Sequence, residues 1–204
     1  GVQTCALPIY KIMASFSPCV EIYLGREIGY VEESPFINVN KRVTYPTWQM
    51  SSSIGGMHAS VVVQFKAKIK ESRNFDFFLN SLAKLGMPLG LFCYSEPKLF
   101  KIFPECPQPK ATIFTLFQFV YQHYKTRWLF LMLFNLMVYE KRLPIFAFLK
   151  ALLYKKRSNI GISLDSIVVQ SSKEEVCEAT IDVIIPTIGR KIYLYDVLQD
   201  LSLQ

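Results

Sequence analysis

The chain of 204 residues has little of what small metal or disulfide scaffolds need. Its five cysteines are scattered and form no Cys-x-x-Cys pair, which argues against a zinc site and a disulfide framework and suits a reducing compartment. Segment 51–56 (SSSIGG) lacks the Lys-Ser/Thr pair that follows the last glycine of a P-loop, and it lacks the third glycine of a dinucleotide turn. We interpret it as an ordinary loop. The neighbouring His58 belongs to no motif and is interpreted as a satisfied or exposed histidine rather than a base or ligand.

Acidic residues are nearly absent from residues 125–157. This segment holds eight basic residues and one acid, Glu140, whereas the other fifteen basic and fifteen acidic residues cancel, so the whole net charge of +7 lies here. The basic residues flank dense apolar runs instead of Gly-rich or RNP-like sequence. A nucleic-acid partner is therefore not expected.

Long apolar runs are also missing. Residues 128–139 contain one polar member, Asn135, but a helix of that length reaches only about 18 Å, well short of the ~30 Å hydrocarbon core of a bilayer. A spanning helix is therefore not expected. We predict that residues 111–153 are mostly helical with a break near Pro144, which lacks a backbone N–H. Two interpretations stay open: helices packed as a scaffold, or an interfacial hairpin on an anionic membrane surface.

Residues 10–100 predict a mixed α/β accessory region. β-Branched and aromatic residues favour strands at 20–24 and 59–66. An apolar strand is predicted at 89–94, and together with the helix before it this strand makes half of an α/β unit in a small Rossmann-like layer. Residues 101–110 contain three prolines and are predicted to link this region to an aromatic and basic helical segment, residues 111–157.

The clearest helix of the first half begins after Asn74, which can cap it. Gly86 is expected to supply a left-handed stop, and Pro88 prevents continuation. The expected apolar face consists of Phe75, Phe78, Leu79, Leu82 and Leu85.

The character of the sequence changes sharply near residue 180. A short β-branched strand at 181–185 is closed by Pro186, and a helix pattern begins within five residues and runs over 190–201. Its apolar stripe consists of Leu194, Val197, Leu198 and Leu201. Asp196 and Asp200 lie on the other side and are predicted to be solvated rather than a metal pair. In a strand–turn–helix unit of this kind, ligands bind at the carboxyl end of the strand, near the free N–H groups of the helix.

This segment resembles the opening of the family 2 glycosyltransferases, whose catalytic domain has the GT-A fold. The family pattern is a Val/Ile strand, then Pro-Thr-aromatic-Asn-Arg, then a helix with Tyr-Leu, Val-Leu, Leu and Gln. The matching residues here are Val183, Ile184, Ile185, Pro186, Thr187, Arg190, Tyr193, Leu194, Val197, Leu198, Leu201 and Gln204. The chain departs from the pattern at Ile188 and Gly189, where the family has an aromatic residue and Asn. The resemblance covers about 25 residues, an eighth of the chain.

The resemblance implies a truncated GT-A start over residues 180–204, with Pro186, Thr187 and Arg190 lining the nucleotide-sugar site. The alternative is that Pro186 ends the strand, Thr187 caps the helix and Arg190 is solvated. No Asp-x-Asp motif follows Pro186. The catalytic residues and a divalent cation (Mn²⁺ or Mg²⁺) are therefore expected only in the full-length protein, and the fragment is expected to be inactive.

The function expected of the full-length protein is sugar transfer from a nucleotide-diphosphate donor to a saccharide or lipid-linked acceptor, in the cytoplasm and peripheral at the inner membrane face. The alternative is a non-catalytic membrane-surface or scaffold protein. Residues 1–9 (GVQTCALPI) resemble a translated sequencing adapter, so we expect them to take no part in the fold.

Overall fold

The computed structural model describes residues 11–18, 22–32, 39–66, 69, 74–100, 110–157, 161–165, 167 and 191–202. The chain divides into two compact units, Gly1–Ser171 and Ser172–Gln204, which are described separately.

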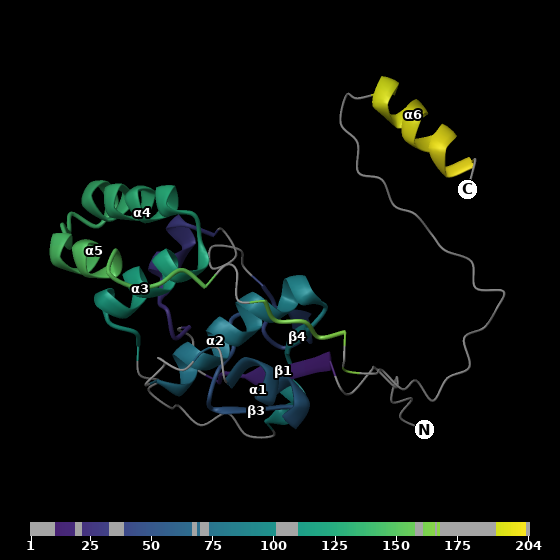
Figure 1. The fold of residues 1–204 in the computed structure, drawn as a ribbon, viewed down its shortest axis with the longest axis horizontal. Coiled ribbons are helices and arrows are strands. Elements are labelled where there is room, and N and C mark those ends of the chain that lie inside the picture. The colour runs from purple at the N-terminus through teal and green to yellow at the C-terminus, as the bar shows by residue number, and fades with distance from the viewer. Residues whose placement is uncertain are drawn as a thin grey trace. The chain divides into compact units, whose positions relative to one another are not determined.

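The first unit contains a four-stranded mixed sheet in the order β2-β4-β1-β3. The strands are β1 (Ile12–Phe16), β2 (Tyr45–Pro46), β3 (Ile54–Met57) and β4 (Phe92–Ser95). The central pair β1 and β4 is parallel, whereas β3 and β2 are antiparallel to their neighbours. The predicted α/β class is confirmed in this form. The parallel pairing brings the carboxyl ends of β1 and β4 to one edge of the sheet. Figure 1 labels both strands in the first unit.

Helix α2 (Phe75–Gly86) begins as predicted, because the side chain of Asn74 accepts a hydrogen bond from the backbone N–H of Phe77 at 3.0 Å. Two details of the prediction are wrong. Gly86 lies inside the helix with φ −80, and the left-handed residue is Gly90, φ 87, after a 3-10 turn at Met87–Leu89. In the predicted apolar face, Leu79 and Leu82 are buried and Phe78 and Leu85 pack half-buried against the core, but Phe75 is 62 % exposed. The buried residues include Phe77, Leu79, Leu82 and Ala83.

The strand predicted at 89–94 is present as β4, but it begins three residues later, because the 3-10 turn and Gly90 occupy the intervening positions. Residues 59–66 form helix α1 (Ala59–Lys66), so the strand predicted there is wrong. Val61 and Phe65, four residues apart, are both fully buried, which is the spacing of one helical face. Packing against the core therefore overrides the β propensity of three consecutive valines.

His58 supports the start of α1, because its Nδ1 accepts a hydrogen bond from the backbone N–H of Ser60 at 3.3 Å. This contact agrees with the interpretation of His58 as a satisfied histidine.

Two further predictions differ from the structure. Residues 22–24, the described part of the strand expected at 20–24, belong to a turn that is closed by a hydrogen bond from the N–H of Gly25 to the carbonyl of Ile22 at 2.9 Å. Part of the expected loop 51–56 belongs to β3, which pairs with β1. A Cβ on Gly55 would lie 2.7 Å from the carbonyl oxygen of Ala14, so this close approach of two strands requires glycine.

The segment after residue 110 is helical, as predicted. Helices α3 (Ile113–His123), α4 (Thr126–Tyr139) and α5 (Ile145–Ala151) follow one another, and Pro144 is the residue immediately before α5. None of the helices that the structure describes combines the length and the apolar character needed to cross a bilayer.

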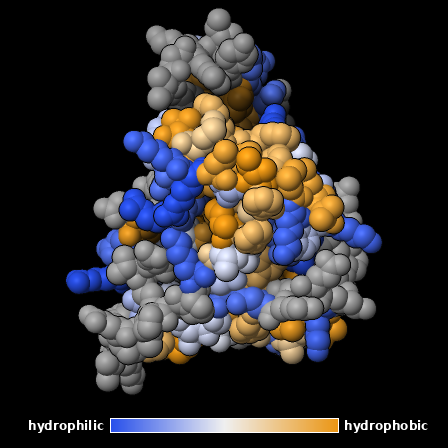
Figure 2. All heavy atoms as spheres, turned by 90° about the vertical axis from the view of Figure 1, so that its left-hand side faces the viewer, coloured by the Kyte–Doolittle hydropathy of each residue, from blue (hydrophilic) through white to orange (hydrophobic). Residues whose placement is uncertain are grey.

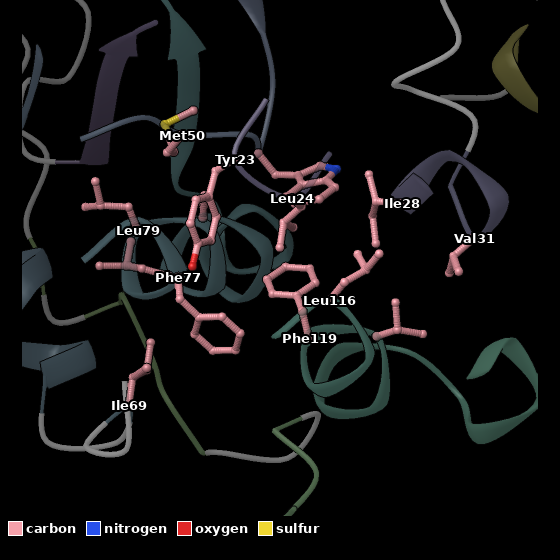
Figure 3. Packing of buried hydrophobic residues seen from close by; sticks show 14 of the residues in the cluster. Tyr23, Leu24, Ile28, Val31, Met50, Ile69, Phe77, Leu79, Leu116 and Phe119 are labelled. Carbon is pink, nitrogen blue, oxygen red and sulfur yellow. The ribbon is translucent and has the colours of Figure 1, made fainter. Parts of the chain in front are cut away.

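The sheet region and the three helices share one hydrophobic core. Phe119 of α3 stacks on Trp48 with ring centroids 5.5 Å apart and meets Phe77 of α2 edge to face at 5.7 Å. Figure 3 shows Phe77 and Phe119 in one cluster with Leu24 and Ile28. Residues on both sides of the predicted linker thus pack together within the first unit.

In the second unit, the structure describes helix α6 (Lys191–Ser202), which confirms the predicted helix over these residues. The predicted strand at 181–185 and the linker residues 101–109 lie outside the described residues.

Candidate functional site

The site residues predicted from the sequence, Pro186, Thr187 and Arg190, lie outside the described residues. Asp196 and Asp200 are exposed on α6, as expected of a solvated face. The nucleotide-sugar site therefore stays a prediction.

A pocket of ≈ 600 Å³ lies at the edge of the sheet where β1 and β4 end. Phe16 is the last residue of β1, and Pro97 and Lys98 closely follow β4. The pocket is lined by Phe16, Lys41, Arg42, Pro97, Lys98 and Phe100. Crevices outside the carboxyl ends of parallel strands are where α/β sheets bind ligands.

The chemistry of this pocket suits an anion with a flat apolar part. Lys41, Arg42 and Lys98 supply positive charge, and two phenyl rings supply apolar surface. Glu96 fixes the turn that carries Lys98, because its Oε1 accepts the backbone N–H of Lys98 at 3.0 Å and its Oε2 accepts the hydroxyl of Thr44 at 2.7 Å. Among the described lining residues there is no Ser, Thr or Cys nucleophile and no histidine or carboxylate base. This lining suits the binding of an anion.

Sequence reasoning missed this pocket. Its basic residues come from two segments, the pair Lys41 and Arg42 before β2 and Lys98 after β4, which only the sheet brings together. The one signal in the sequence was a basic residue shortly after the predicted strand 89–94.

A second polar cluster surrounds the carboxylate of Glu32. Its Oε1 accepts the indole N–H of Trp48 at 2.5 Å, and its Oε2 accepts hydrogen bonds from Lys84 and the hydroxyl of Tyr124. The ammonium of Lys84 also lies 4.9 Å from the Trp48 ring centroid and 4.7 Å from that of Tyr124. Burial alone would raise the pKa of Glu32, but the hydrogen bonds from Lys84 and Tyr124 outweigh it and lower the pKa. This ionised carboxylate accepts hydrogen bonds from three side chains and ties α2 to the end of α3.

A serine–histidine pair lies deeper in the same region. His123 Nε2 is 3.0 Å from the hydroxyl of Ser81, and Arg157 donates to that same hydroxyl at 3.1 Å. Nδ1 of His123 is buried and has no hydrogen-bond partner among the described residues. A proton on Nδ1 would be an unsatisfied buried donor, so we infer that His123 is neutral and donates from Nε2 to Ser81, whose oxygen can accept twice. Burial, and then the charges of Arg157 and Lys84, lower the pKa of His123 to about 3.

This pair has the residue types of a hydrolase nucleophile and base but not their surroundings. Ser81 is fully buried, so no substrate reaches its hydroxyl. The thiol of Cys93 is no better placed, because it is buried and burial raises its pKa to about 12. Within the described ranges there is also no group of three His, Cys, Asp or Glu side chains that could hold a metal ion. These groups are best explained as the polar part of the core.

Comparison of the chain with protein families, with curated proteins and with solved structures gives no match. Any functional inference accordingly rests on the residues of the chain itself.

Proposed function

We propose that this chain is part of a family 2 glycosyltransferase, which transfers a sugar from a nucleotide-diphosphate donor to a saccharide or lipid-linked acceptor. The observation that carries the proposal is the motif Pro186-Thr187 with Arg190, which follows a β-branched segment and leads directly into α6. A strand, a tight turn and a helix in this order are the opening of an α/β nucleotide-binding domain.

The proposed roles follow from the chemistry of the motif residues. Thr187 offers backbone and hydroxyl contacts to the base and ribose. Arg190, which precedes Lys191 in the sequence, would pair with the diphosphate in a charge-assisted, two-pronged contact. The free N–H groups of the first turn of α6 would favour the same negative charge.

The divalent cation that the family resemblance implies does not fit the described residues, which include no suitable cluster of ligands. We therefore assign no step to a cation here. The paired acids and the carboxylate base of the proposed enzyme are expected elsewhere in the coding sequence. A cytoplasmic location is proposed, because the scattered cysteines suit a reducing compartment.

The second candidate function is a non-catalytic scaffold. It is favoured by the polar groups of the core, since Glu32, Ser81 and His123 are engaged or buried in a way that fits structure rather than chemistry.

The coding sequence around this chain separates the two candidates. A glycosyltransferase must carry paired acidic residues at a strand end within roughly the next hundred residues, and their absence would remove the enzyme proposal. The product that contains them should transfer sugar from a UDP- or GDP-linked donor. Transfer should fall in Arg190→Ala and persist in Lys191→Ala, the neighbouring cation. Equal losses in the two variants would contradict the role of Arg190.

A further inference from the structure

Helices α4 and α5 each present a second apolar stripe on the side opposite the core. On α4 the core side buries Leu129, Met132 and Leu136, and on α5 it buries Ala147, Phe148 and Ala151. The exposed stripes include Phe130, Phe134 and Val138 on α4, and Phe146, Leu149 and Leu153 on or just after α5. We call these six exposed residues and the surface between them the outer face.

The outer face is strongly exposed and continuous. Phe146 is 82 % exposed and Leu153 is 85 % exposed, although both side chains are large and apolar. The two helices contact each other through the rings of Phe130 and Phe148, whose centroids are 5.0 Å apart. Figure 2 shows the apolar surface as one area on this side of the molecule. Soluble monomers rarely expose a contiguous apolar patch of this kind unless it binds something.

Positive charge flanks this area at both ends of the helix pair. We call the exposed cations of the two helices and their connections the basic rim; they are Lys125, Arg127, Lys141, Arg142, Lys150, Lys155 and Lys156. The one acid in residues 125–157 is Glu140, and its Oε1 accepts the hydroxyl of Tyr30 at 2.9 Å. A binding partner that complements the outer face is therefore apolar at its centre and anionic around its edge.

An anionic lipid bilayer has both properties at once. Amphipathic helices that lie in the interface bury their apolar side about 5–10 Å into the headgroup and acyl boundary, while lysine and arginine reach the headgroups. The described helices are too short to span the bilayer but long enough to lie on it. A second copy of the chain is a poorer partner for the outer face, because a symmetric contact would bring two basic rims together and their charges would repel.

We propose that the outer face docks on the surface of an anionic bilayer, with α4 and α5 in the plane of the headgroups. The docking needs no catalytic activity and does not depend on the proposed glycosyl transfer.

Flotation of the chain with lipid vesicles tests the proposal. The chain should bind vesicles of phosphatidylcholine mixed with an equal share of phosphatidylglycerol, and bind pure phosphatidylcholine much more weakly. Binding should weaken steeply with salt, because the Debye length shrinks from about 8 Å at physiological ionic strength to about 3 Å at 1 M. Removing one rim cation, as in Lys141→Ala, should weaken binding about fivefold. The proposal would be overturned by an absence of binding to the mixed vesicles, or by binding that depends neither on salt nor on phosphatidylglycerol.

A matched pair of double variants separates the outer face from general surface effects. Phe146→Glu with Leu153→Glu should weaken binding more than about tenfold, because each side chain loses its burial in the acyl region. Val63→Glu with Phe75→Glu makes the same change of charge at exposed apolar residues of α1 and α2, and should weaken binding much less. Equal effects of the two pairs would contradict docking through α4 and α5. Circular dichroism and thermal melts check that both variants keep the wild-type fold.

Sedimentation without lipid tests the competing occupant. The wild-type chain should sediment as a monomer. A dimer that dissociates in the Phe146→Glu, Leu153→Glu variant would assign the outer face to a second copy and overturn the proposal.

Discussion

Protonation of His123 should make the stability of the fold depend on pH in a defined window. The folded protein holds the pKa of this histidine at about 3, by burial and then by the charges of Arg157 and Lys84, against 6.5 for an ordinary histidine. The unfolded chain therefore binds a proton more readily than the folded one, so stability is lost as pH falls below 6.5. The loss grows by ~1.4 kcal/mol for each pH unit down to the folded pKa. At pH 5 it amounts to about 2 kcal/mol.

Urea unfolding of wild type and His123→Gln at pH 7 and pH 5 measures this contribution. Glutamine keeps a polar group beside Ser81 but does not titrate, so the stability of wild type relative to the variant should fall by about 2 kcal/mol on going from pH 7 to pH 5. His58→Gln is the control, because His58 is the other of the two histidines and lies outside this cluster. A relative stability that stays the same at both pH values would contradict this prediction, since it would mean that the folded state accepts the proton on His123 without penalty.

Two further predictions concern the sheet and the ligand sites. Gly55→Ala should destabilise the fold by roughly 1–3 kcal/mol, because the new Cβ would clash with Ala14 of the paired strand. Gly56→Ala is the control and should change stability little, because a Cβ on Gly56 has no atom within 4 Å. Similar unfolding midpoints for the two variants would contradict the β1–β3 pairing. Calorimetric titration of the chain with UDP- and GDP-sugars plus Mn²⁺ should show no binding in the micromolar range, because the proposed nucleotide-sugar motif Pro186, Thr187 and Arg190 alone supplies few polar contacts. Micromolar binding that is lost in Lys98→Ala would instead assign a nucleotide to the pocket at the ends of β1 and β4.

Features that depend on near neighbours in the chain could be predicted from the sequence alone. The side chain of Asn74 reaches the backbone three residues on, so it caps α2 wherever the helix packs. Pro144 cannot continue a helix, and a new helix starts directly after it. The periodicity after Arg190 likewise predicts α6 without any reference to the rest of the fold.

Contacts between distant segments set which face of each element is buried and which residues it packs against. Residues 59–66 have the composition of a strand, but the core offers a site for Val61 and Phe65 on one helical face, and burial there outweighs a propensity difference of about 1 kcal/mol or less. Gly55 can pair closely with β1 because it has no Cβ, and Ala14, far away in sequence, leaves no room for one.

The polar contacts of the core depend on the tertiary structure in the same way. The pocket beside Lys98 and the hydrogen bond from Arg157 to Ser81, 76 residues apart, join segments that share no local pattern. Local hydrogen bonds and backbone restrictions act over a few residues, so they can be predicted from the sequence. Burial and contacts between charges depend on residues that are brought together only in the folded chain.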